Sequence, residues 1–227
     1  MILGVFAYSI IGLIFFFTVE FIKKFFLLRA ENTRKLVHVG SSLIVCTMPF
    51  FIDKIGIIIL SGLFIIIFSL SRNFGILTSI HAVSRKTIGE FSMAAGVGIS
   101  ASVLLPSSTV AFVYGMLILG FSDTSANIIG SQWKLWEFKI MSQRKTISGS
   151  AAFFLCSVMI SYSTAYYVGL DIKLDMLLVL CLTLTLVEAV HIFGLDNLTL
   201  PLLSGISWNY FTAVSYTHLT LPTILLV

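Results

Sequence analysis

Charged residues are scarce in this chain. Of its 227 residues, 11% are charged and 58% are hydrophobic, and the mean hydropathy is +1.05. A soluble domain of this length needs more polar surface than that to cover itself. The apolar runs are continuous and do not alternate with polar residues, which argues against a transmembrane β-barrel. The composition therefore predicts an all-α, polytopic membrane protein.

Cysteine is also rare, and Cys46, Cys156 and Cys181 each stand alone in an apolar run. With no CxxC pair and no Cys/His cluster, neither a disulfide framework nor a zinc site is expected. The stretch AGVGISA at 95–101 mimics part of a dinucleotide fingerprint, but no strand precedes it. Its position inside an apolar run favours close helix packing by small residues. No soluble nucleotide-binding domain and no nucleic-acid partner are expected.

Seven apolar runs predict about seven transmembrane helices. The first lacks the basic start and the small-residue cleavage site of a signal peptide, and Lys23 and Lys24 follow it, so we expect a retained helix. The seven predicted spans are 2–22, 36–52, 55–71, 91–106, 108–127, 149–169 and 175–194.

The basic residues predict the topology. Twelve of the fourteen Lys and Arg residues follow the first, third or fifth span, and only Lys54 and Lys173 lie in the opposite loops. By the positive-inside rule, the three basic loops face the cytoplasm and the N-terminus lies outside. Most other polar residues lie at the same helix ends. We therefore expect a site at the cytoplasmic face of a bacterial or archaeal-type plasma membrane.

The C-terminal segment differs from what precedes it. Its residues VSYTHLTLPT at 214–223 match an in-frame translation of a common transposase sequencing adapter. Such segments are set aside from fold reasoning. We expect residues 1–213 to form a single integral-membrane catalytic domain, truncated at its C-terminus, and residues 214–227 to be adapter read-through that is not native.

Two polar clusters precede the middle of the chain. In the first, Arg34 and His38 are four residues apart and share one helix face. This cluster is suited to a functional site, or to anchoring the protein on anionic lipids. In the second, at 84–90, two cations, a glycine and Glu90 come just before an apolar span. This loop is suited to phosphate binding, or it is a topology signal with Glu90 favouring the helix start.

The third cluster follows the fifth span. Asp123 and Asn127 are one helical turn apart, which suits contacts to Mg²⁺ or to a substrate hydroxyl. Arg144 and Lys145 are suited to neutralising phosphate charge, and residues 148–150 offer donors at the next helix start. The competing interpretation is a capped helix followed by a solvated loop.

The fourth cluster begins inside the seventh span with Glu188 and continues with Asp196 and Asn197. An ionisable group within a bilayer is a functional candidate by default, because burying its charge is costly. The competing interpretation is that Glu188 forms an ion pair with an arginine of another helix.

These clusters together resemble one family of membrane enzymes, the CTP-dependent lipid kinases. This family includes phytol kinase, dolichol kinase and the CTP-using diacylglycerol kinase, and it is grouped with the phosphatidate cytidylyltransferases. The resemblance covers about residues 30–213, with its pieces in the right order. The pieces are RKLVH at 34–38, RKTIGE at 85–90, LGFSDTSANIIG at 119–130, KTISGSAAFF at 145–154 and EAVHIFGLDNLTLPL at 188–202.

The resemblance implies an enzyme that moves the γ-phosphate of CTP onto a lipid alcohol with the help of Mg²⁺ or another divalent cation. It implies Asp123 and Asp196 as metal ligands or bases, Arg85 and Lys145 on phosphates, and Glu188 or Glu90 as an orienting carboxylate. Asp123, Asp196, Glu188 and Lys145 form the expected catalytic set. The expected substrate- and phosphate-binding residues are Arg34, Lys35, His38, Arg85, Gly89, Glu90, Asn127, Gly149, Ser150 and Asn197.

The chain departs from the family pattern in two places. Ser122 stands where the family usually has glycine, and residues 130–134 read GSQWK where it usually has a Gly-Lys pair. These departures leave the donor nucleotide open. The sequence also leaves open the lipid alcohol, the identity of the base and the oligomeric state.

Two other functions compete with the kinase. A phosphatidate cytidylyltransferase also uses CTP and a metal, but its lysine-aspartate and His-Gly-Gly patterns followed by paired aspartates are absent from the sequence. A small lipid transporter or flippase would place polar groups near the bilayer midplane on broken helices. In this chain the polar groups gather towards one face instead, as expected of an enzyme with a cytosolic and a lipid substrate.

Overall fold

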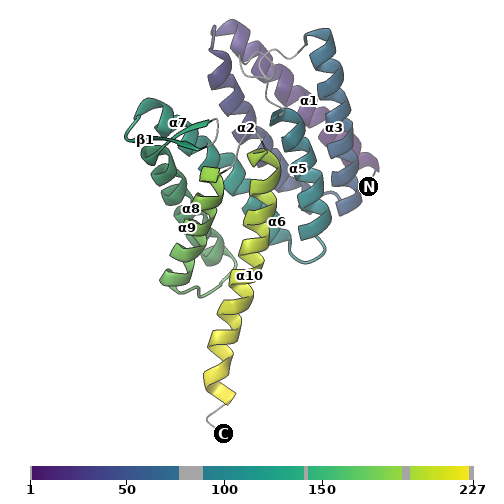
Figure 1. The fold of residues 1–227 in the computed structure, drawn as a ribbon. Coiled ribbons are helices and arrows are strands. Elements are labelled where there is room, and N and C mark those ends of the chain that lie inside the picture. Colours follow the sequence, from purple (N-terminus) through teal and green to yellow (C-terminus); the bar gives the residue numbers. More distant parts are fainter. Residues whose placement is uncertain (1, 77–88, 141–142, 191–194, 225–227) are drawn as a thin grey trace.

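The protein is described by a computed structural model, which covers residues 2–76, 89–140, 143–190 and 195–224; for Gln143 and residues 215–224 only the backbone is described. The described chain is mostly helical (Figure 1). The helices are α1 (Ile2–Phe25), α2 (Ala30–Thr47), the 3-10 helix η1 (Met48–Phe50), α3 (Lys54–Phe74), α5 (Gly89–Leu104), α6 (Thr109–Leu117), the π-helix η2 (Ile118–Asp123), α7 (Thr124–Gln132), α8 (Ile147–Tyr167), α9 (Leu174–Val190) and α10 (Asp196–Ile224).

Most helices overlap the predicted apolar spans, but the seven predicted spans do not include α10. Within the described residues, four are long and apolar enough to cross a membrane: Ile2–Phe25, Lys54–Phe74, Thr109–Gln132 and Ile147–Tyr167. Helix α5 is apolar but shorter. The helical, membrane-like character is therefore confirmed, whereas the number of seven spans and their orientation stay predictions. The non-native origin of residues 214–227 also stays a prediction.

Local chemistry sets several helix ends. The side chains of Asp53, Ser108 and Thr146 accept hydrogen bonds from backbone N–H groups in the first turns of α3, α6 and α8. Such caps satisfy donors that have no partner inside the helix. Helix α3 ends at Gly75, whose φ of 64° lies in the left-handed region that favours glycine.

A short two-stranded hairpin accompanies the helices of this all-α fold. Strands β1 (Glu137–Ile140) and β2 (Gln143–Thr146) pair in antiparallel register within the stretch expected to be a loop. The register places Glu137 opposite Thr146 and Ile140 opposite Gln143. The hairpin leads directly into α8, so it fixes how the chain enters that helix.

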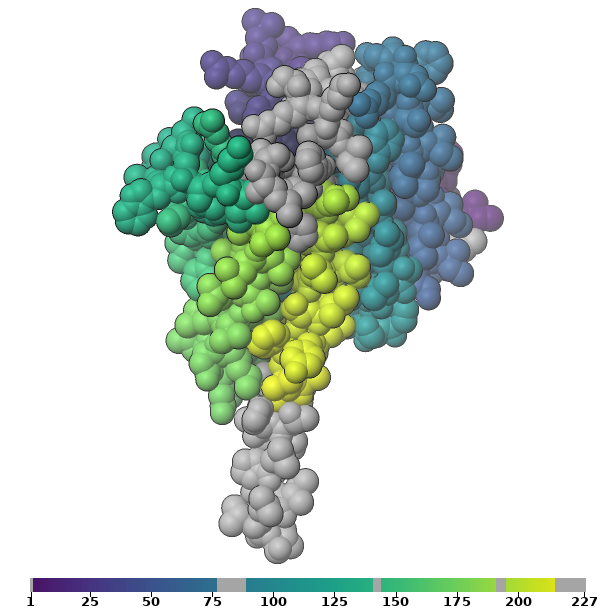
Figure 2. Space-filling view, in the orientation of Figure 1, coloured from purple at the N-terminus to yellow at the C-terminus, as the bar shows by residue number. Residues whose placement is uncertain are grey.

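The helices form two groups that meet around α6, η2 and α7, which make one continuous helix (Figure 1). Helix α1 packs on α2 and α3, and α3 packs on α5. On the other side, α8 packs on α7 and α9. Helix α10 packs on α5, α6 and α9, and α9 and α10 lie side by side on the face in Figure 2.

The main core lies where α6, α8 and α10 meet. The Tyr114 ring centroid is 4.5 Å from that of Trp208, and its hydroxyl lies 2.8 Å from Ser161 Oγ. Small residues bring other helices together: a Cβ on Gly96 would lie 2.4 Å from the carbonyl oxygen of Asn197. The small-residue helix packing predicted for 95–101 is therefore confirmed at Gly96.

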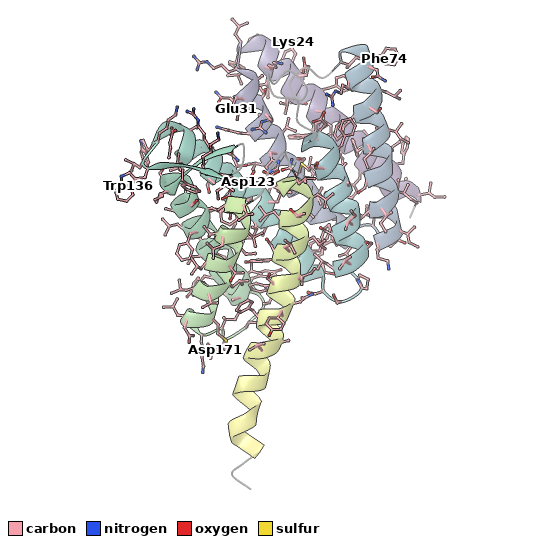
Figure 3. The ribbon with its side chains drawn as sticks, viewed as in Figure 1. Lys24, Glu31, Phe74, Asp123, Trp136 and Asp171 are labelled. Atoms are coloured by element: carbon pink, nitrogen blue, oxygen red, sulfur yellow. The ribbon has the colours of Figure 1, made fainter. Side chains whose placement is uncertain are left out.

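The two ends of the molecule differ in charge. Figure 3 shows Lys24 and Glu31 at one end and Asp171 at the other, with Asp123 inside the bundle between them. The last turns of α1 and α3 carry Lys23, Lys24 and Arg72 and lie at the same end as Glu31. Among the described residues, the basic last turns of α1 and α3 thus lie at one end of the fold, which we call the basic end.

Candidate functional site

A cavity of about 590 Å³ begins among polar side chains and continues into apolar surroundings. Its walls come from α1, α2, α3 and α5, and the starts of α7 and α10 complete its polar end. Many expected site residues therefore lie around one cavity although they come from distant parts of the chain. These are Arg34, Lys35, His38, Gly89, Glu90, Asp123, Asn127, Asp196 and Asn197.

Asp123 is the last residue of the π-helix η2 and is only 6% exposed. His38 Nε2 lies 3.4 Å from Asp123 Oδ2 and 3.2 Å from the carbonyl oxygen of Leu119, which is in the same π-helix. Because both neighbours are acceptors, we assign the ring hydrogen to Nε2, which donates to them. His38 thus fixes the carboxylate of Asp123, and π-turns of this kind are frequent at functional sites.

Two further side chains of α7 line the polar end. Asn127 Nδ2 donates to the carbonyl oxygen of Asp123 over 2.9 Å, so its amide is held on its own helix. Thr124 is 7% exposed, and its hydroxyl has no hydrogen-bond partner among the described residues. A buried hydroxyl without a protein partner is costly unless a ligand or water supplies one. Sequence reasoning missed Thr124, for which the only signal is its place next to Asp123.

The start of α10 brings Asp196 and Asn197 to the same place. Asn197 Nδ2 donates to the carbonyl oxygen of Gly89 over 2.9 Å, and its backbone N–H donates to Asp196 Oδ1 over 3.0 Å. These bonds fix the start of α10 on the start of α5. Asp196 is close enough to Asp123 for the two carboxylates to interact electrostatically.

The two aspartates fit a magnesium ion that is bound together with a phosphate. Within the part of the chain that the structure describes, no group of three or more His, Cys, Asp or Glu side chains is placed to hold a metal alone. Mg²⁺, however, is usually bound by one or two carboxylates, water and substrate phosphates. Asp123 and Asp196 line one cavity and carry no arginine or lysine salt bridge in the described residues, so their donor chemistry suits that mode.

Cations lie on the other side of the polar end. Arg34 Nη2 is 2.9 Å from Glu31 Oε1, while Arg34 Nε is buried with no partner among the described residues. Lys35 lines the cavity beside it. Glu90 Oε1 lies 3.8 Å from Arg72 Nη1, a partner that the sequence marked only as a topology signal. Arg85 lies outside the described residues.

Lys145 and Glu188 form an ion pair next to the cavity. Lys145 Nζ donates to Glu188 Oε1 and, over 3.2 Å, to the carbonyl oxygen of Glu188. Neither is among the described residues that line the cavity, but the charge of Lys145 acts on both Asp123 and Asp196. The competing interpretation of Glu188 as an ion-pair partner thus has support, with lysine in the place of arginine.

Gly149 and Ser150 belong to the junction of α7 and α8. The N–H of Gly149 donates to Thr146 Oγ1 over 3.1 Å, and a Cβ on Gly130 would lie 3.3 Å from Gly149 Cα. Gly149 therefore allows two helices to approach closely, and its N–H already has an acceptor. Neither it nor the half-buried Ser150 is among the cavity-lining residues described.

Comparison with known proteins gives two relatives. The chain is 27% identical to phytol kinase of Synechocystis sp. over an alignment of 207 residues that covers 84% of each protein. It is 28% identical to the uncharacterized protein RP860 of Rickettsia prowazekii over 208 residues, covering 80% of this chain and 94% of that protein. No protein-family model and no solved structure matches the chain. The similarity to phytol kinase, over most of both chains, confirms the resemblance to the lipid kinase family on which the motifs converge.

Proposed function

We propose that this protein is a membrane-embedded kinase that transfers the γ-phosphate of CTP, with Mg²⁺, to a lipid alcohol such as phytol. The observation that carries the proposal is the single cavity that joins two aspartates and two cations to an apolar interior. A nucleotide phosphate needs polar, charged surroundings, and a hydrocarbon chain needs apolar ones. A kinase that joins the two must place these surroundings next to each other. The similarity to a phytol kinase supports the same reaction class.

Phosphoryl transfer depends mainly on positioning and on stabilising charge, and it needs little covalent chemistry from the protein. Asp123 and Asp196 would hold the Mg²⁺, which when bound offsets the negative charge of the phosphates. Arg34 and Lys35 line the same end of the cavity and supply positive charge for the phosphate oxygens. The ion pair of Lys145 with Glu188 fixes a further cation close behind both aspartates.

The acceptor hydroxyl approaches from the apolar side of this cluster. Its oxygen forms a bond to the γ-phosphorus while the bond from that phosphorus to the β-bridging oxygen breaks, and CDP leaves. The hydroxyl proton passes to the carboxylate of Asp123 or Asp196, both of which line the cavity. His38 keeps Asp123 oriented, and the hydroxyl of Thr124, which has no partner among the described residues, would donate to a phosphate oxygen.

A label-transfer assay tests this proposal. The protein, purified in detergent, is incubated with Mg²⁺, phytol and CTP that is radiolabelled at either the γ- or the α-phosphate. We expect γ-label in the lipid product and no α-label. If phosphatidate is supplied as the lipid, transfer of the α-label to the lipid product would indicate a cytidylyltransferase instead. Absence of transfer to every alcohol, with CTP or another nucleoside triphosphate, would contradict the kinase.

The Asp123→Asn variant tests the site itself. Removing one charge-stabilising group typically lowers the turnover number by about 100- to 1,000-fold, and we expect a loss of this size. The matched control is Asp171→Asn, an exposed aspartate at the opposite end of the molecule. Both variants should insert and purify like the wild type. Full activity of Asp123→Asn would exclude Asp123 from the reaction.

A further inference from the structure

The cavity extends far beyond the polar cluster. Beneath His38 it continues along α2 past Ile44 to Met48, between apolar side chains of α1, α3 and α5. From His38 to Met48 the helix rises about 15 Å, at about 1.5 Å per residue. No charged side chain lines this lower part among the described residues.

Aromatic rings line the cavity next to the polar cluster. The Phe16 ring centroid is 5.8 Å from that of Phe64 and 5.4 Å from that of Phe68. Glycine makes room for these rings, since a Cβ on Gly12 would lie 2.5 Å from Phe64 Cζ and one on Gly40 would lie 2.4 Å from Phe15 Cζ. Because Phe16, Phe64 and Phe68 pack on one another and line the cavity, this part of the cavity has an apolar wall that suits a hydrocarbon chain.

Tyr8 forms a floor at the far end. Its hydroxyl lies 2.9 Å from Thr47 Oγ1, which ties α1 to α2, and its ring packs 6.4 Å from that of Phe51. Just beyond Tyr8, α1 and the segment after η1 approach so closely that a Cβ on Gly4 would lie 2.3 Å from Ile52 Cγ2. The apolar part of the cavity is therefore closed at this depth.

The geometry points to a blind acceptor pocket that takes one hydrocarbon chain of medium length, with Tyr8 as the residue that limits chain length. This inference rests on the proposed lipid-alcohol kinase and specifies its substrate class. A chain of C–C bonds of about 1.5 Å advances about 1.3 Å per carbon in its extended zigzag, so about 12 carbons fill the depth. Single-chain isoprenoid or fatty alcohols fit, whereas long polyprenols and two-chain diacylglycerols exceed the pocket.

Acceptor competition tests the length limit. We expect wild-type protein to phosphorylate farnesol at least tenfold more efficiently, as kcat/KM, than a long-chain polyprenol or a diacylglycerol. Tyr8→Ala should raise the relative efficiency with longer single chains by about tenfold. Tyr8→Phe keeps the ring and should leave the preference unchanged. Phe6→Ala, on the exposed face of the same helix, serves as the control for aromatic truncation. Equal length preference in wild type and Tyr8→Ala would overturn the inference.

A binding readout separates this inference from the reaction class. A single-chain alcohol with a photoreactive diazirine at its tail end is crosslinked to the purified protein, and the labelled peptides are identified by mass spectrometry. We expect labelling at Tyr8, Met48 or Ile57, which lie at the closed end. Labelling there without any phosphoryl transfer would contradict the kinase and keep the pocket. Labelling confined to exposed faces of the helices would overturn the pocket even in an active enzyme.

Discussion

At the residue scale, the side chains of the polar cluster differ in whether they already form hydrogen bonds within the protein. Some side chains donate hydrogen bonds to other groups of the protein and so fix the local structure: Asn127, Asn197 and Lys145. Thr124 and the Nε of Arg34 are buried without a partner among the described residues. The engaged groups thus build a rigid frame, and the unengaged ones are the groups left to meet a ligand.

Thr124→Val tests that distinction. A hydrogen bond to a charged group contributes about 1.5–3 kcal/mol, so losing one to a phosphate should lower kcat/KM by about 10- to 100-fold. Thermal stability should not fall, because the hydroxyl has no hydrogen-bond partner among the described residues to lose. The matched control is Thr183→Val, whose exposed hydroxyl donates to the carbonyl oxygen of Val179 in its own helix. An unchanged kcat/KM in Thr124→Val would show that this hydroxyl meets no substrate.

His38→Ala tests the positioning of Asp123. Without its donor, the carboxylate loses orientation, and losses of this kind weaken metal binding by about 10- to 100-fold. We expect the Mg²⁺ concentration for half-maximal activity to rise by that factor, with activity partly restored at high Mg²⁺. His38→Gln keeps an N–H donor and should recover part of the affinity. A fall in maximal rate with unchanged Mg²⁺ dependence would contradict this role.

At the scale of elements, packing sets the position of the site. Gly96 of α5 lies against the backbone of Asn197 and Leu198, so α10 begins directly on α5. The same contact places Asp196 beside Asp123. The position of Asp196 relative to Asp123 thus depends on the absence of a side chain at Gly96 in α5.

Gly96→Ala should disturb this contact. The added Cβ would lie 2.4 Å from Asn197 O and 2.8 Å from Leu198 Cα, both backbone atoms, so the start of α10 must shift. Overpacking of this kind costs about 1–3 kcal/mol, and we expect a lower melting temperature together with reduced label transfer.

Gly62→Ala provides the control, since a Cβ there meets nothing within 4 Å. Alanine replaces a helical glycine in α3, so stability should stay equal or rise by about 0.5–1 kcal/mol. Gly96→Ala with wild-type stability and activity would show that α10 adjusts without moving Asp196.

The sequence predicted the apolar helices well, because long apolar runs and alternating basic loops are strong local signals. It also placed Asp123 and Asn127 on one face of a helix. The hairpin at 137–146 was not predicted, since its short strands carry charged residues and lie in a polar stretch. The Lys145–Glu188 pair depends on tertiary packing, so its partner could not be read from either segment alone. Arg72 was likewise missed as a partner of Glu90.

At the scale of the whole molecule, the basic end and the opposite end are chemically distinct. The polar mouth of the cavity opens towards the end that carries Glu31, Arg34 and Lys35. The apolar floor at Tyr8 lies deep towards the other end. A nucleotide bound at the polar mouth and the hydrocarbon chain of a lipid alcohol held in the apolar part would therefore lie on opposite sides of the reacting point.

Cysteine labelling tests the predicted orientation. In a background without the three native cysteines, Lys24→Cys and Lys173→Cys place single exposed thiols at the opposite ends. A membrane-impermeant maleimide added to intact cells should label only Lys173→Cys, because the positive-inside rule places the basic end in the cytoplasm. Permeabilised cells should show both labels. Labelling of Lys24→Cys in intact cells would reverse the topology.

The π-helix η2 limits which sequence changes this protein tolerates in that turn. Each residue of an α-helix turns the chain by about 100°, and a π-turn holds an additional residue within its turn. Phe112 and Met116 can therefore face the core while Asp123, further along the same helix, faces the cavity. Deleting one residue between Ile118 and Ser122 would restore an ordinary helix and rotate Asp123 away from His38. Related sequences should accordingly tolerate changes of residue type in this turn more readily than changes of its length.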